Sequence, residues 1–149
     1  MARYNKILRG PVDENKPQVR ESICATAVLP GTALVISGAN FAQAGANVAD
    51  VFYLAQDNYL ALKGVDDAWP AGDRVIGIHP QDDEVYAVRV PTGQNIAAGD
   101  NLTTSAAGKF VKATTGQRTC FYALESYNNT SGADQLVNAR VANTNLPAA

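Results

Sequence analysis

The chain has 149 residues, the length of a single domain, and 46% of them are hydrophobic, which is enough to bury a core. Only 17% are charged and the formal net charge is −2, so we expect no binding to nucleic acid, which depends on clustered Lys and Arg. One His and two Cys exclude most metal-centred and nucleophilic chemistry, so we expect a protein that is not an enzyme and holds no metal or cofactor. No apolar run is as long as a membrane helix, and no apolar segment of a signal peptide follows Met1. We therefore expect that the protein does not contact a membrane and that it is made in the cytoplasm.

Residues 1–21 form a segment that differs from the rest of the chain. Pro11 and Pro17 cannot donate to a β-ladder, and the first nine residues carry three cations and no acid. Such a segment is either a loose terminus or an arm that becomes ordered on a partner. As an arm it would bind through its cations and its apolar side chains, which are Arg3, Tyr4, Lys6, Ile7, Leu8 and Arg9.

From residue 22 onward short runs of β-branched and aromatic residues alternate with Gly, Pro, Asn and Asp, which predicts an all-β domain over 22–149. The regular spacing favours a small β-barrel or β-sandwich with an extended N-terminal arm. A short helix over 41–49 is the one helical alternative, and Gly45 interrupts it. The predicted strands cover 22–28, 33–37, 50–55, 74–79, 84–90, 101–104, 109–113, 119–125 and 135–142.

Two parts of the chain resemble each other and indicate duplicated hairpin units, about 30–91 and 97–142. Leu34 matches Leu102 at an offset of 68, and an offset of 69 then places Phe41 on Phe110 and the Phe–Tyr pair at 52–53 on the pair at 121–122. Each unit later closes with an Arg–Val strand, at 89–90 and at 140–141. Units of this size are too small to bury their own faces, so we expect them to share one core.

The first unit carries an acidic insertion, about 57–84. It holds seven acids against two cations, whereas residues 1–20 hold five cations against two acids. The insertion is either a solvated loop or the surface that meets the basic arm of a neighbouring subunit. Tyr59 and Trp69 also offer an aromatic platform for a ligand, or pack the loop against the body. The insertion's candidate partner-binding residues are Asp66, Asp67, Trp69, Asp82, Asp83 and Glu84.

The residues able to carry out chemistry are few and scattered. His79 ends an apolar strand before Pro80, and we expect a structural residue whose ring bonds to the backbone. Cys24 and Cys120 lie on separate predicted strands without a C-x-x-C spacing, so we expect buried free thiols rather than a redox or zinc site.

The hairpin at 98–113, with its A-G-D-x-L turn and its G-K-F-V-x-A return, resembles the repeated hairpin of the small β-rich head decoration, or capsid cement, proteins of tailed bacteriophages. The resemblance implies a virion protein on the outer surface of an expanded capsid, made in the cytoplasm of a bacterial host. It also implies that the major capsid protein is the partner and that copies associate, as trimers or as dimers. A carbohydrate-binding module or a tail-fibre β module is the alternative.

Overall fold

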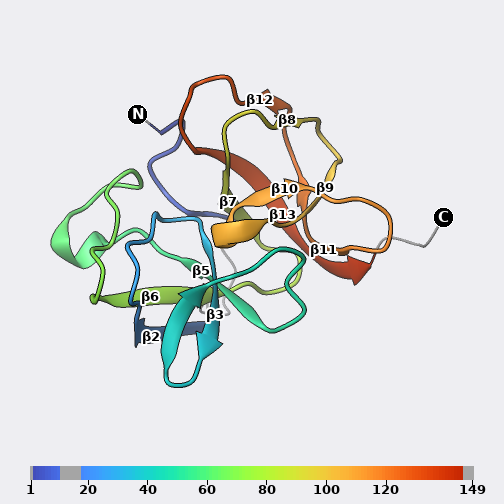
Figure 1. The fold of residues 1–149 in the computed structure, drawn as a ribbon. Coiled ribbons are helices and arrows are strands. Elements are labelled where there is room, and N and C mark those ends of the chain that lie inside the picture. The colour runs from blue at the N-terminus through green and yellow to red at the C-terminus, as the bar shows by residue number, and fades with distance from the viewer. Residues whose placement is uncertain (1, 11–17, 146–149) are drawn as a thin grey trace.

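The computed structural model describes residues 2–10 and 18–145, and nearly all of its regular structure is β (Figure 1). The predicted all-β fold is confirmed. The five-stranded sheet has the spatial order β2 (Gln18–Ile23), β6 (Arg74–His79), β5 (Phe52–Ala55), β3 (Ala33–Ser37) and β4 (Asn40–Gln43). The six-stranded sheet has the order β1 (Leu8–Gly10), β7 (Val85–Val90), β13 (Gln135–Asn145), β11 (Arg118–Ala123), β9 (Asn101–Thr104) and β10 (Phe110–Lys112). β8 (Asn95–Ile96) pairs with β12 (Tyr127–Asn128), and the short helices η1 (Tyr59–Ala61) and η2 (Ala106–Gly108) lie in loops.

Both helices in the described part of the chain are single turns of three residues, and neither is long and apolar enough to cross a membrane.

The five-stranded sheet curls until its two edge strands meet. A bridge joins Cys24 to Phe41, and the Ser22 hydroxyl donates to the Ala39 carbonyl at 2.7 Å. The space inside the curl is filled by a buried cluster that includes Leu34, Phe41 and Trp69. A glycine is required at Gly77 on β6, because a Cβ there would meet the Phe41 ring at 2.7 Å.

A second and larger cluster of buried side chains packs along the six-stranded sheet and fills the junction between the two sheets. Phe121 lies edge-on to Phe110, with their ring centroids 5.1 Å apart, and Phe52 of the other sheet approaches Phe121 at 5.9 Å. Such edge-to-face pairs add to the free energy gained from burying the rings. This larger cluster contains buried residues of both predicted units, and the cluster inside the five-stranded sheet is a second one that the sequence did not predict.

The predicted repeat corresponds to an equal order of strands in the two sheets. The order β4-β3-β5-β6 in one matches β10-β9-β11-β13 in the other, and the hairpins have the same register, with Ile36 opposite Phe41 and Thr104 opposite Phe110. The Phe–Tyr alignment, however, is wrong by one residue, because Tyr53 lies opposite Leu34 whereas Phe121 lies opposite Leu102. The shift puts Phe52 at the junction, since neighbouring side chains on a strand point to opposite faces.

Several predicted elements differ from the structure. The strand expected over 22–28 begins earlier, at Gln18, and ends at Ile23, because residues 18–21, assigned to the arm, pair with β6. The helix considered over 41–49 is absent from this described segment, where β4 pairs with β3 instead. The strand that closes the first unit, β7, joins the six-stranded sheet through β13, so the first unit is divided between the two sheets.

The two cysteines are buried and free, as predicted. Burial raises the pKa of the Cys120 thiol from 9.0 to about 11. Because the unfolded chain releases that proton near pH 9 and the folded chain keeps it, we expect the free energy of unfolding to fall as the pH rises from 9 to 11, by about 1.4 kcal/mol per pH unit at most. Urea unfolding at pH 8 and pH 10.5 measures this loss. The Cys120→Ala variant should show a smaller loss, and an equal loss would contradict the assignment.

Candidate interaction surface

The N-terminal segment, residues 2–10, lies extended along its own chain. β1 pairs with β7, the Ala87 amide donates to the Ile7 carbonyl at 2.7 Å, and the Ile7 side chain is fully buried. Leu8 is half-buried against the same cluster. Ile7 and Leu8, two of the predicted partner-binding residues, therefore contact the chain's own core, while residues 11–17 of the predicted arm lie outside the described residues.

The two arginines of this segment contact aromatic rings. With these rings and a nearby carboxylate they form what we call the N-terminal cluster: Arg3, Tyr4, Arg9, Glu125 and Tyr127. The Arg3 guanidinium lies 3.8 Å from the centroid of the Tyr127 ring and pairs with the Glu125 carboxylate at 3.6 Å. The Arg9 guanidinium lies 4.6 Å from the Tyr4 ring, whose hydroxyl donates to Glu125. Burial, then Glu125, raises the pKa of Tyr4. Cation–π contacts at exposed sites contribute about 0.5–1 kcal/mol each, so they favour this arrangement of Arg3 and Arg9. Both arginines remain exposed, as does Lys6.

The acidic insertion meets the N-terminal segment. The Asp66 carboxylate accepts hydrogen bonds from the Ala2 amide and from the Arg89 guanidinium, and Asp67 accepts one from the Gly64 amide at 2.7 Å. Residues 2–5 and 64–67 line a groove of about 550 Å³. The structure thus brings together two segments that the sequence predicted as complementary, and it does so within one chain.

The remaining predicted residues of the insertion lie elsewhere. Of the two alternatives for Tyr59 and Trp69, the structure shows packing of the loop for Trp69, which is only 5% exposed and whose indole N–H donates to the Gln56 carbonyl at 2.7 Å. Glu84 is buried and accepts hydrogen bonds from the Tyr86 hydroxyl and the Gln81 amide. Burial and this bond to Glu84 raise the pKa of Tyr86. Asp82 and Asp83 are exposed in the turn between β6 and β7.

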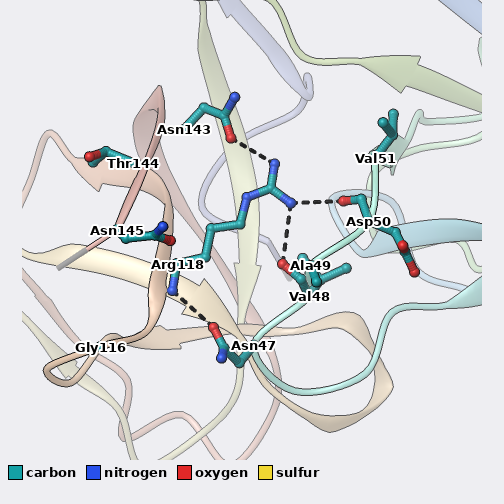
Figure 2. A pocket seen from close by; sticks show the side chains of 10 residues that line it. All are labelled: Asn47, Val48, Ala49, Asp50, Val51, Gly116, Arg118, Asn143, Thr144 and Asn145. Atoms are coloured by element: carbon teal, nitrogen blue, oxygen red, sulfur yellow. Dashed lines mark hydrogen bonds between the residues drawn. The ribbon is translucent and has the colours of Figure 1, made fainter.

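A groove of about 590 Å³ next to Arg118 was not predicted (Figure 2). The guanidinium donates to the Val48 and Asp50 carbonyls at 3.2 and 2.7 Å and to the Asn143 side chain at 2.8 Å. The groove is assembled from residues near 47–51, 116–118 and 143–145, which are too far apart in the chain to form a sequence motif. Its described lining contains no aromatic ring on which a sugar could stack, so the groove does not favour the carbohydrate-binding alternative.

The single histidine lies at the end of β6, with its ring centroid 5.6 Å from that of Tyr53. Among the described residues its buried Nδ1 atom has no hydrogen-bond partner, so the expected bond from the ring to the backbone is not found there. Within residues 2–10 and 18–145, no three His, Cys, Asp or Glu side chains converge as they would around a metal ion.

No protein-family model and no curated protein sequence matches the chain. Among solved structures it is similar to the N base of the head fiber protein gp8.5 of bacteriophage phi29, with a TM-score of 0.59 and 20% sequence identity. The similarity covers 88% of this chain and 98% of the phi29 chain. The described chain therefore has the fold of a phage head-fiber base.

Proposed function

We propose that the chain is a structural protein of a tailed-bacteriophage virion that binds the outer surface of the expanded capsid and stabilises it by bridging copies of the major capsid protein. The observation that carries this proposal is the fold shared with 98% of a phage head-fiber base. That neighbour is the base of a fiber, so attachment of a longer appendage to the head is the second candidate. Both roles require the same first step, which is binding to the shell.

Stabilisation would follow from selective binding. A protein that binds the expanded shell and not its precursor stabilises the expanded form by mass action. Several weak contacts within one oligomer would give strong overall binding. We therefore also propose that copies associate, as trimers or as dimers, which sedimentation equilibrium of the purified chain would measure.

The experiment that tests the proposal is co-sedimentation of the purified chain with expanded and with unexpanded shells of the phage that encodes it. We expect binding to expanded shells only, a higher temperature of shell disruption, and weaker binding as salt rises, because exposed charges are screened within about 8–10 Å near physiological ionic strength. Failure of the unmodified chain to bind expanded shells would contradict the proposal.

The structure also decides which variant tests the basic segment. Removing residues 1–16 would remove β1 and the buried Ile7, so a loss of binding would not separate contact from folding. We expect the charge reversal Lys6→Glu to weaken shell binding, because Lys6 is an exposed cation of this segment. Arg74→Glu reverses another exposed cation, on β6, and is the matched control. Equal effects of the two variants would contradict a specific role for the N-terminal segment.

A further inference from the structure

The loop around η1 presents three apolar side chains to solvent, which we call the apolar tip: Tyr59, Leu60 and Leu62. They are 48%, 71% and 93% exposed. In Figure 1 this green loop projects from the body at the left of the view. Single exposed apolar residues are common on protein surfaces, but three within four positions of a projecting loop form a contiguous patch of the kind that marks a binding site.

The apolar tip is held in a fixed shape by its own backbone. The Asn58 carboxamide oxygen accepts from the Ala61 amide at 3.3 Å, and the Asn58 carbonyl accepts from the Lys63 amide at 3.0 Å. The Leu62 amide donates to the Tyr59 carbonyl at 3.1 Å. These bonds close a tight turn, so the loop would lose little conformational entropy on binding.

Both ends of the loop are anchored in buried structure. On one side the Trp69 indole donates to the Gln56 carbonyl at 2.7 Å. On the other, the buried Arg89 guanidinium donates to the Val65 carbonyl at 2.6 Å. The apolar tip is therefore an exposed feature on a rigid support.

Leu62 carries a conformational cost that its own chain does not offset. Its φ is +56°, in the left-handed region, which is unfavourable for a residue other than glycine. Its side chain is 93% exposed, so burial within the described chain gives almost nothing in return. Unfavourable backbone geometry combined with an exposed apolar side chain points to a function in binding.

We propose that the apolar tip inserts into an apolar pocket of the phage shell, and that basic side chains of the shell line the rim of that pocket. The proposal rests on the proposed function. The basic rim follows from charge, because the loop that carries the tip exposes three acids, Asp66, Asp67 and Asp73, and one cation, Lys63.

The test compares shell binding by the double variant Leu60→Ser/Leu62→Asn with that by Leu124→Ser, which changes a leucine that is 44% exposed elsewhere on the surface. Asn tolerates a positive φ, so the double variant should unfold at the same temperature as the unmodified chain. We expect it to bind expanded shells about 30-fold more weakly, as truncation of an interface hot spot does. We expect Leu124→Ser to bind normally.

The outcomes separate the two proposals. Binding of the double variant as tight as that of the unmodified chain would overturn the insertion of the tip and leave the proposed function intact. Failure of the unmodified chain to bind shells would overturn both. Hydroxyl-radical footprinting gives a second readout, in which Tyr59, Leu60 and Leu62 should be protected on the shell. Unchanged labelling of these side chains, or loss of self-association with shell binding retained, would overturn the inference.

Discussion

Replacing Arg89 with alanine is expected to lower the free energy of unfolding by about 3–5 kcal/mol, the cost of removing one partner from a buried, charged hydrogen-bond network. The Arg89 side chain is 1% exposed, and its Nε donates to the Pro30 carbonyl at 3.0 Å. Its two Nη atoms donate to the Val65 and Asp134 carbonyls and to the Asp66 carboxylate, at 2.6, 3.2 and 3.3 Å. The substitution would leave these acceptors unpaired, in addition to a cavity.

The chain offers a matched control, because the repeat aligns Arg89 with Arg140 and Arg140 is exposed. Arg140→Ala should change stability by no more than about 0.5 kcal/mol. Urea unfolding measures both effects, and amide hydrogen exchange at residues 64–67 should be faster in Arg89→Ala, because the loop loses its anchor. Equal effects of the two variants would contradict the role assigned to Arg89.

Most strands of this fold could be predicted from local sequence. The strands at 33–37, 74–79 and 101–104 have the predicted bounds, because runs of Leu, Val, Ile and Thr there are ended by Gly, Pro or polar turn residues. The strands that were missed are β1, β4, β8 and β12, each of two to four residues. Such short strands exist because a neighbour pairs with them, and for β1, β8 and β12 that neighbour is remote in the sequence.

Sheet membership and register could not be predicted in the same way. β6 and β7 follow one another in the chain, yet they join different sheets. The one-residue error at the Phe–Tyr pairs has the same origin, since both residues are aromatic and only the packing around Phe52 decides which of them faces the junction. The two separate clusters arise because Val28 and Trp69, from loops, supply the apolar surface that one hairpin unit lacks.

The sequence predicted the charges of the candidate surface, but it did not predict which of its side chains are buried and which are exposed. The basic segment and the acidic insertion do meet, at Ala2 and Asp66. Sequence could not show that Trp69 turns inward while Leu60 and Leu62 turn outward, because residues 57–73 contain no periodic pattern from which burial could be inferred. The exposure of the apolar tip is set by the turn at Asn58 and by the anchors Trp69 and Arg89.

A second large effect is expected at Gly108, in the turn between β9 and β10 that touches the other sheet. A Cβ at this position would lie 2.3 Å from the Ala33 carbonyl oxygen and 2.8 Å from Cγ2 of Thr32. The same carbonyl accepts from the Ala44 amide at 2.9 Å, and the Gly108 amide donates to the Ala44 carbonyl at 2.8 Å. Because the Cβ would meet backbone, Gly108→Ala has to separate the turn from β3, and we expect a loss of about 3 kcal/mol or more.

Gly116→Ala separates this steric effect from backbone strain. Both glycines have a positive φ, +68° at Gly108 and +83° at Gly116, but no atom lies within 4 Å of a Cβ built at Gly116. Gly116→Ala should therefore show only the left-handed cost of about 1–2 kcal/mol. Urea unfolding of the two variants gives the difference between them. A large difference means that the two sheets meet at a close-packed junction, as a clamp that bridges capsid subunits would require. Equal losses would mean that the turn moves away from Ala33 at no cost, and that this junction does not hold the two sheets rigidly together.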